Sequence, residues 1–342
     1  MISLLPHIGR RLFSIMKAVF DTIGTHNGVF HCDEVLGCAM LKILRPGAQI
    51  IRTRDEDKLA KCDIVIDVGS IYDLEKLRFD HHQRDFNHTM STLIPNKKWT
   101  IKLSSAGLVY CHYGKDILRA LVKNINESDL EKLFDRMYES FIQEIDAIDN
   151  GIPICEGQAN YTINTNLSAR VKRLNKRWNQ DDFNEEKAFS DAMNMVSKEF
   201  EGQVSYYVKD WLPARDIVLQ AINNRFKIHL SGSIIHLSQN CPWKGHFFDL
   251  EKELNLPPTI KFVLFDGGQG MWRVQAVSLD EDSFLLRVPL LESWRGLRED
   301  KLFQVSGIEG IKFVHSSGFI GGNSSMQGAL EMAVRTIAET KN

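Results

Sequence analysis

Several features that mark other protein classes are scarce in this 342-residue sequence. It has only six cysteines, spread along the chain with no C-x-x-C pair, and it shows no secretory cleavage pattern. We therefore expect reduced, structural thiols and not a disulfide framework. No apolar run reaches the roughly 18 residues of a membrane span, because Arg10, Arg11 and Lys17 interrupt the early one. A soluble protein with no membrane partner is expected.

Neither sign of charge dominates the sequence. Lys and Arg total 42 against 44 Asp and Glu, which gives a net charge of -2. This balance argues against a basic surface over the whole chain, so any site for a polyanion must be local. With 43% hydrophobic and 25% charged residues, the chain can bury a large core, which excludes overall disorder. At roughly 150 residues per domain, the length predicts two domains.

Acidic residues are absent from the first twenty positions, and the first acid is Asp21. Arg10, Arg11 and Lys17 stand there among serines and large apolar residues, which is typical of a mitochondrial presequence. We expect residues 1–17 to be such a presequence and the protein to reside in the mitochondrial matrix, with the nucleus left open as a second location. The alternative is an N-terminus that is disordered or that leads into the first strand.

Alternating strand and helix signals predict a parallel α/β domain over residues 18–165. A loosely alternating segment at 18–25 ends in a polar turn, and apolar residues then recur at helical spacing from 35 to 44. Residues 63–69 form a short apolar run that closes with an acid and a glycine, as strands of parallel sheets often do. Ligands of such sheets bind at the carboxyl ends of the strands, so the loops that follow are candidate sites.

A helical region follows this domain. Residues 128–131 have capping-box spacing and precede a periodic apolar pattern that stops at Asp149-Asn150-Gly151. A second helix is expected over residues 185–208, and Pro213 predicts a boundary before another helix. Residues 166–212 are therefore expected to be a helical connector between two domains.

The last part of the sequence changes to short apolar segments, which predict a smaller mixed α/β domain over residues 213–342. A glycine-rich loop at 266–270 is expected to join two of them as a hairpin. A helix is expected from about Ser325. The apolar segments lie at residues 228–230, 233–237, 260–265 and 271–277.

The first motif with chemical potential places His26, His31 and Asp33 between the first strand and its helix. Imidazole and carboxylate groups on one loop can converge on a divalent cation, and Gly28 allows the backbone to turn tightly. The alternative is that Asp33 and Glu34 only complement the positive N-terminus of the helix, while the histidines make ordinary loop hydrogen bonds.

Three further motifs follow. Asp67 closes the second apolar strand, where it would face the same crevice. A short apolar segment leads into Asp80, His81 and His82. Taken alone, these three polar residues would also suit a solvated loop. Asp149 ends the periodic helix, where an acid opposes the helix dipole unless a cation lies nearby.

In this order the motifs resemble those of the DHH phosphoesterase superfamily. Residues 25–34 (THNGVFHCDE), 78–84 (RFDHHQR) and 146–151 (DAIDNG) are similar to the Myg family of exonucleases in particular. The likeness extends over most of the chain after the first twenty residues or so, and the four-part combination is far more specific than any single motif. The first motif departs from the common superfamily pattern, because His31 stands where an aspartate is usual.

The resemblance implies a metal centre and a role for each motif residue. Two divalent ions, Mn²⁺ in preference to Mg²⁺, would activate a water molecule for phosphodiester hydrolysis. Asp67 would bridge the ions. His81 would bind a metal ion or phosphate, His82 would contact phosphate, and Asp80 would orient one of these imidazoles. The catalytic set is then Asp33, Asp67, Asp80, His81 and His82. The metal ligands are His26, His31, Asp33, Asp67, His81 and Asp149.

Two further regions are candidates for binding substrate. Five basic residues and no acid occur between residues 157 and 180, and Arg170 and Arg173 are taken from this run as backbone contacts for a nucleic acid. A solvated helix face is the alternative. In the last domain, the segment 313–323 resembles the glycine-rich substrate loop of DHH-associated domains. It contributes His315, Gly321, Gly322 and Asn323, and Arg295 is added as a nearby cation.

The function expected from these motifs is 3′ to 5′ exonuclease activity on single-stranded RNA, with the polarity implied by the resemblance alone. One alternative is a phosphoesterase that acts on pyrophosphate or short nucleotides, because the same metal centre would serve both reactions. Another is a non-catalytic RNA-binding protein on the same fold, although the intact set of ligands argues against it. The sequence leaves the oligomeric state open, a homo-oligomer included.

Overall fold

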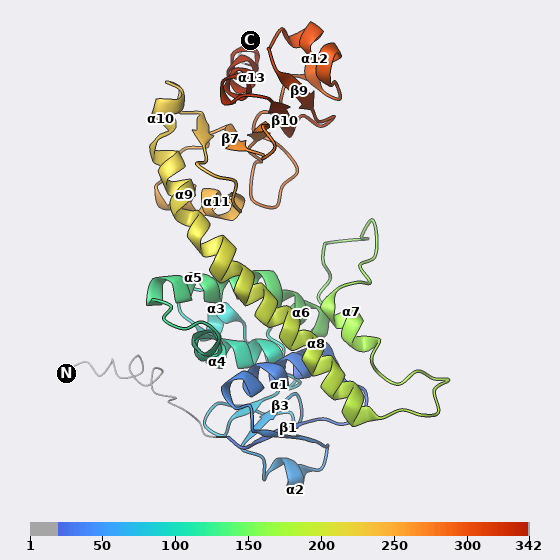
Figure 1. Cartoon of the computed structure of the whole chain (residues 1–342). Coiled ribbons are helices and arrows are strands. Elements are labelled where there is room, and N and C mark those ends of the chain that lie inside the picture. The colour runs from blue at the N-terminus through green and yellow to red at the C-terminus, as the bar shows by residue number, and fades with distance from the viewer. Residues whose placement is uncertain (1–19, 341–342) are drawn as a thin grey trace, which may run out of the picture. The chain divides into compact units, whose positions relative to one another are not determined.

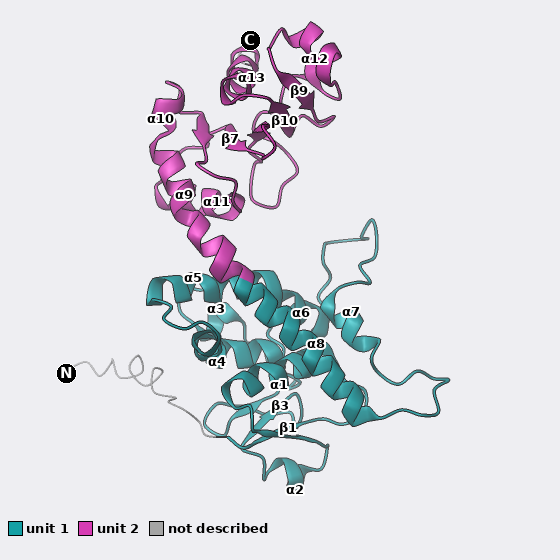
Figure 2. Ribbon diagram, in the orientation of Figure 1, with its two compact units in different colours: residues 1–205 teal, residues 206–342 magenta. Residues whose placement is uncertain are grey.

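The computed structural model describes residues 20–340 and shows two α/β units (Figure 1). The first comprises residues 1–205 and the second residues 206–342 (Figure 2). The boundary falls inside the segment 166–212, which we expected to connect two domains. The predicted presequence at residues 1–17 lies outside the described residues. Across 20–340, no helix is both long enough and apolar enough to cross a membrane.

The described residues of the first unit contain a five-stranded sheet in the order β2-β1-β3-β5-β4. Its strands β1, β2, β3 and β5 are parallel, as predicted, but the edge strand β4 pairs antiparallel with β5. The strands are short apolar segments flanked by polar loops. They are β1 (Thr22–Thr25), β2 (Gln49–Arg52), β3 (Ile64–Ile66), β4 (Tyr72–Asp73) and β5 (Arg78–Phe79).

Helix α1 (Cys32–Leu44) is the central helix of this unit. Its first ten residues are all buried, because the helix packs between the sheet and helix α4 (Ser105–Leu121). At Gly37 a Cβ atom would lie only 2.9 Å from Ile66 Cδ1, so the glycine lets the helix lie close to β3. Three short helices complete the periphery of the unit, namely α2 (Glu56–Leu59), α3 (Met90–Leu93) and α7 (Leu167–Lys172).

The periodic helix predicted before Asp149 is three consecutive helical segments. They are α5 (Glu127–Met137), the π-helical turn η1 (Tyr138–Ile142) and α6 (Gln143–Asp149). The expected capping box at residues 128–131 is wrong, since the N-cap is Asn126, whose side chain accepts a hydrogen bond from Asp129 N. The predicted stop is confirmed, with Asn150 as the C-cap and Gly151 at a φ of 67°.

The helix predicted over residues 185–208 is α8 (Glu185–Tyr206), but Pro213 does not interrupt the helical path. The π-helical turn η2 (Tyr207–Trp211) leads directly into α9 (Leu212–Asn223), and Pro213 lies in the first turn of α9. A proline cannot donate the usual backbone hydrogen bond. In η2 the Leu212 N–H donates to Tyr207 O, which shifts the bonding pattern just before the proline.

The described residues of the second unit form a sheet in the order β6-β7-β8-β10-β9, with β6 and β7 parallel and the other pairs antiparallel. Side chains alternate across β7, so that Phe262 and Leu264 face one core and Val263 and Phe265 face the other. The strands are β6 (Ile234–His236), β7 (Phe262–Asp266), β8 (Trp272–Ala276), β9 (Ile311–Val314) and β10 (Ile320–Asn323).

Helices cover both cores of this second sheet. Residues of α9 and α11 (Lys244–Glu253) belong to one core, and residues of α12 (Glu299–Ser306) and α13 (Met326–Glu339) belong to the other. Two short helices, α10 (Arg225–Ile228) and η3 (Glu292–Trp294), complete the described elements. The hairpin at 266–270 and the helix after Ser325 are confirmed.

One expected apolar segment of this unit is not a strand. Ile228 is the last residue of α10, His229 and Leu230 follow it, and Leu230 is 91% exposed. Gly232 donates a backbone hydrogen bond to His229 O and has a φ of 64°, so the chain turns here instead of extending. Three large residues next to one another were insufficient evidence for a strand without a partner strand to pair with.

Candidate metal centre

The motif residues gather at the carboxyl ends of three adjacent parallel strands. His26 follows β1, Asp67 follows β3, and the Asp80-His81-His82 segment follows β5. The carboxyl ends of parallel strands share one edge of the sheet, which brings loops that are distant in sequence together. Asp33 comes from the first turn of α1 and Asp149 from the end of α6.

Local backbone geometry sets the direction of these side chains. Gly28 has a φ of 87°, a conformation available to glycine that lets the chain turn between His26 and α1. His31 is the N-cap of α1, and the Glu34 carboxylate accepts a hydrogen bond from His31 N at 2.9 Å. Asp67 itself has a φ of 58°, in the left-handed region that a non-glycine residue seldom adopts. Such strained conformations cluster at functional sites.

Asp67 contacts histidines on two sides. Its Oδ2 lies 3.3 Å from His26 Nε2, and its Oδ1 lies 3.4 Å from His81 Nε2. Ser105 Oγ donates a further hydrogen bond to Asp67 Oδ1 at 3.2 Å. Each oxygen of this one carboxylate therefore belongs to a different cluster of donor atoms.

Donor atoms around His26 form the first cluster. His26 Nε2 lies 3.1 Å from Glu34 Oε1, and one donor atom from each of His26, His31, Glu34 and Asp67 lies within 4.8 Å of the others. His26, Glu34 and Asp67 are buried, whereas His31 is exposed at the rim. Two imidazoles and two carboxylates are a donor set that suits a transition metal such as Mn²⁺ or Zn²⁺.

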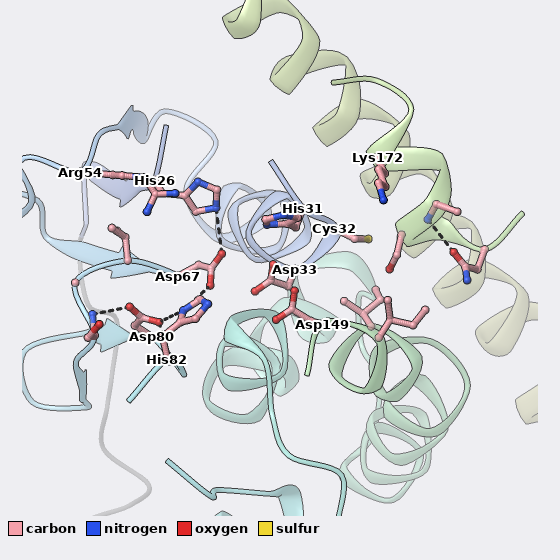
Figure 3. A pocket seen from close by; sticks show the side chains of 18 residues that line it. His26, His31, Cys32, Asp33, Arg54, Asp67, Asp80, His82, Asp149 and Lys172 are labelled. Carbon is pink, nitrogen blue, oxygen red and sulfur yellow. Dashed lines mark hydrogen bonds and ion pairs between the residues drawn. The ribbon is translucent and has the colours of Figure 1, made fainter. Parts of the chain in front are cut away.

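Donor atoms around His81 form the second cluster. His81 Nε2 lies 3.0 Å from Asp149 Oδ2 and 4.0 Å from Asp33 Oδ2. Asp67, His81 and His82 form an overlapping group of donor atoms. The structure thus brings together all six predicted metal ligands, in two clusters that Asp67 connects. Figure 3 shows five of them from close by, namely His26, His31, Asp33, Asp67 and Asp149.

Asp80 holds the His82 imidazole in place. Its Oδ1 lies 2.7 Å from His82 Nδ1 and accepts a hydrogen bond from His82 N, while its Oδ2 accepts one from Ser70 N. Asp80 is buried, but the side chain of His82 is 57% exposed. The hydrogen bond with Asp80 raises the pKa of His82, which favours an imidazolium at the mouth of the site.

Asp33 provides the test of whether these groups fit a cation. Both of its carboxylate oxygens are buried, and neither has a hydrogen-bond partner among the residues described. Burial, together with the charges of Asp67 and Asp149, raises the pKa of Asp33 well above its usual range. A buried carboxylate without donors is costly unless a cation compensates it, so the residues fit a bound divalent ion.

The histidines and Asp67 compensate one another when no ion is bound. Burial opposes protonation of His26, but hydrogen bonds and charge from Asp67 and Glu34 outweigh it and raise its pKa to about 10. Asp149 and Asp67 overcome burial in the same way and raise the pKa of His81 to about 10. Burial alone would raise the pKa of Asp67, yet the bonds from His26 and His81 hold it well below its usual range.

These groups open into a cavity of about 720 Å³, lined entirely by residues of the first unit. Arg54 and Lys172 also line it (Figure 3), and neither side chain forms an ion pair with another described residue. Two free cations beside a group of carboxylates leave positive charge available for an anionic ligand. The wall opposite the sheet includes Asn166, Ser168 and Ala169 at the beginning of α7.

Unlike the predicted metal ligands, the predicted substrate-binding residues are divided between the two units. Arg170 forms an ion pair with Glu199 at 2.7 Å, and Arg173 is exposed at the end of α7. In the second unit, His315 is exposed and lies beside Phe319. Arg295 donates from Nε to Leu290 O, which holds the guanidinium against its own loop.

The glycine-rich segment 313–323 is not a continuous loop. Gly321, Gly322 and Asn323 lie in the buried strand β10, between β8 and β9. Asn323 donates to Glu309 O and accepts from Ser325 N, so its amide closes the turn into α13. A Cβ at Gly321 would approach Met332 Cε to 2.6 Å, which accounts for this glycine by packing. Their binding role stays a prediction.

Glu34 is the donor that the sequence did not single out as a ligand. From the sequence, its only expected role was the alternative one of complementing the N-terminus of the helix. Its carboxylate does accept a hydrogen bond from His31 N, but Oε1 also lies 3.1 Å from His26 Nε2. Arg54 was also missed, because it lies in the segment after β2, which carries no recognisable motif. Its position one strand away from His26 becomes evident only from the parallel pairing of β1 with β2.

Comparison with known proteins places the chain in a family. The family model for MYG1 exonucleases, described as "Uncharacterised protein family (UPF0160)", matches residues 22–337. The chain belongs to this family. It is 51% identical to the MYG1 exonuclease of Rattus norvegicus, covering 93% of this chain and 84% of the relative. Identity to the Homo sapiens MYG1 exonuclease is 50%, covering 93% and 86%, and to the Dictyostelium discoideum MYG1 protein 46%, covering 93% and 97%.

Membership of the MYG1 family confirms the resemblance that the motifs indicated. The match spans both units and every element that carries a motif residue. The names of the mammalian relatives describe exonucleases. They say nothing of the nucleic acid, the polarity or the metal.

Proposed function

We propose that this protein is a metal-dependent exonuclease that hydrolyses single-stranded RNA in the 3′ to 5′ direction. The observation that carries the proposal is the position of Asp67, whose two oxygens each face a separate cluster of imidazole and carboxylate donors. Paired divalent sites joined by one carboxylate are a recurring arrangement in enzymes that cleave phosphate esters. The exonuclease names of close relatives support the same class of reaction.

The residues present would hold two divalent ions. One ion would be bound by His26, His31 and Glu34, and the other by His81, Asp33 and Asp149. Asp67 would be a ligand of both ions. Such ions supply Lewis-acid activation of water and stabilise negative charge on phosphate. The mixture of imidazole and carboxylate donors favours Mn²⁺ over Mg²⁺.

Other side chains of the chain would act on the substrate itself. His82, held by Asp80 and partly exposed, is placed to donate a hydrogen bond to a phosphate oxygen. Arg54 and Lys172 offer unpaired positive charge at the cavity wall, which would attract the backbone of a strand end. Asp80 acts on His82 and not on substrate, so it is a positioning residue.

The choice of RNA and of polarity rests on the family likeness, and the proposed compartments rest on the N-terminal composition. Basic and apolar residues without acids in the first twenty positions favour import into the mitochondrial matrix. We include the nucleus as a second compartment and a homo-oligomer as the form to be tested by solution mass measurement.

Hydrolysis of end-labelled RNA of defined length tests the proposal. With Mn²⁺ present, a 5′-labelled single strand should shorten stepwise, and EDTA should stop the reaction. A 3′-labelled strand should release labelled mononucleotide at once, which establishes the polarity.

Three results would contradict it. Turnover of pyrophosphate or dinucleotides without shortening of longer strands would favour a small-substrate phosphoesterase. RNA binding without any Mn²⁺-dependent hydrolysis would favour a non-catalytic binding protein. Equal shortening of duplex and single strands would remove the single-strand preference.

A further inference from the structure

Trp178 is the most exposed tryptophan of this chain. Its side chain is 97% exposed, whereas Trp99, Trp211, Trp243 and Trp294 are buried and Trp272 is half-buried. Single apolar side chains at a surface are common, but tryptophan is enriched where proteins bind partners, because its ring offers a large area for stacking. The exposure of Trp178 therefore gains meaning only from the residues around it.

The residues that precede Trp178 carry positive charge only, and the nearest acids along the chain are Asp181 and Asp182. The segment 157–180 has no acidic residue, and Lys172, Arg173, Lys176 and Arg177 form no ion pair with any described residue. Arg170 alone is neutralised, by Glu199. Unpaired cations next to an exposed ring form a surface that attracts an anion with a flat, stackable group.

This surface, which we call the 172–178 strip after its first and last residues, begins in the wall of the metal cavity. Lys172 lines the cavity, and helix α7, which ends at Lys172, packs against both α1 and α6. Those two helices carry Asp33 and Asp149. Trp178 does not line the cavity, so the strip leads away from the site of the motif residues.

Asn175 fixes the strip to the metal loop. Its Oδ1 accepts a hydrogen bond from Phe30 N at 2.9 Å, and its Nδ2 donates to Phe30 O at 2.8 Å. Phe30 immediately precedes His31, so one side chain ties the middle of the strip to a candidate metal ligand. The strip is thus held in a defined relation to the cavity and is not an independent loop.

We propose that the 172–178 strip binds the nucleotides of a single-stranded nucleic acid that lie beyond the one being cleaved, with a base stacked on Trp178. The inference rests on the proposed nuclease function. Cations contacting phosphates together with aromatic rings stacking on bases are the usual means of holding single strands without sequence preference. A peptide partner would also bury the ring, but a strip with four unpaired cations that begins in the wall of the candidate metal cavity favours nucleic acid.

Binding is tested first without catalysis, using the full chain in EDTA and an oligouridylate of about ten nucleotides. Base stacking on Trp178 should quench tryptophan fluorescence, and Trp178→Ala should abolish the quenching. In addition, Trp178→Ala should weaken binding measured by anisotropy of a labelled oligonucleotide by about tenfold, and Trp178→Phe should restore most of it. Phe284→Ala, which removes a ring that is 99% exposed in the second unit, is the matched control and should change neither signal.

Kinetics then separate this inference from the proposed function. With Mn²⁺, Trp178→Ala should raise KM for a ten-nucleotide strand by about tenfold while leaving its kcat and the hydrolysis of a dinucleotide unchanged. If Trp178→Ala left the affinity and the KM for the long strand unaltered, the proposed binding role of the strip would be wrong. The exposed ring would then have to contact another partner. Absence of hydrolysis by the unmodified protein would instead count against the nuclease proposal. The binding measurements in EDTA would still test whether the strip binds a single strand.

Discussion

Nε2 of His26 lies 3.3 Å from Oδ2 of Asp67, across the carboxyl ends of the adjacent strands β1 and β3. Both groups are buried, so water cannot fully solvate either of them. The other oxygen of the same carboxylate faces His81. This one carboxylate therefore couples the two donor clusters, and most of the predictions below follow from it.

Replacing Asp67 by Asn should remove activity without unfolding the protein. The amide keeps the size of the side chain but loses the charge that serves both clusters. We expect hydrolysis to fall by more than about 100-fold, since even residues behind the ligands contribute 10- to 100-fold. Circular dichroism should remain unchanged. The control is Asp57→Asn on the exposed helix α2, and equal activity of the two variants would remove Asp67 from the mechanism.

Glu34 should behave as a metal ligand and not only as part of the helix cap. Glu34→Gln retains an oxygen that can accept from His31 N but loses the charge facing His26. We expect Mn²⁺ affinity, measured by calorimetry, to fall by about 10- to 100-fold with little change in melting temperature. A large loss of stability with normal metal affinity would show that Glu34 acts only as a cap.

Metal binding should release protons and strengthen as pH rises. His26 and His81 have pKa values of about 10 in the metal-free protein, and an imidazole must lose its proton to bind a metal ion. Mn²⁺ affinity should therefore increase by about tenfold per pH unit for each displaced proton between pH 6 and 8. Calorimetry in buffers of different ionisation enthalpy counts the protons. An affinity that does not vary with pH would mean that these histidines are not ligands.

The same histidines should stabilise the metal-free fold on the acid side. Their folded pKa is raised above the ordinary value of 6.5, so their contribution is fully present below about pH 6.5 and is lost as pH rises toward 10. His26→Gln should reduce the free energy of unfolding in EDTA more at pH 6 than at pH 9. Urea denaturation at the two pH values measures the difference, and an equal loss at both would contradict the assigned pKa.

Two helical glycines should respond oppositely to alanine. A Cβ at Gly107 would lie 2.2 Å from Oδ1 of the buried Asp146, which accepts hydrogen bonds from Ser104 N and Oγ. Gly107→Ala should cost at least about 1–3 kcal/mol. Gly202→Ala in α8 meets no atom within 4 Å and should add about 0.4–1 kcal/mol. Thermal denaturation compares them, and equal effects would mean that Asp146 can move aside.

Several motif residues could be predicted because they stand at the end of an element that periodicity predicts. Asp67 closes an apolar run, and Asp149 precedes the Asn150-Gly151 stop of a helix. Parallel strands then require that the residues after β1 and β3 be neighbours. The likeness to a known family indicated that the remaining motifs belong to the same site, which no single motif could indicate.

Other features depend on contacts that no local pattern encodes. The sequence around Gly321 reads as a loop because glycine is disfavoured in strands, yet packing against Met332 and Phe313 requires the absence of a side chain there. The second contact of Glu34 with His26 depends on how β1 lies beside α1. The helical path through Pro213 depends on a π-helical turn that shifts the hydrogen bonds just before it.

Anomalous diffraction at the manganese edge from crystals grown with Mn²⁺ tests the central claim most directly. Two peaks should flank Asp67, one beside His26 and Glu34 and the other beside His81 and Asp149, and both should weaken or vanish in Asp67→Asn. A single ion away from Asp67, or no ion at a concentration that supports hydrolysis, would contradict the account.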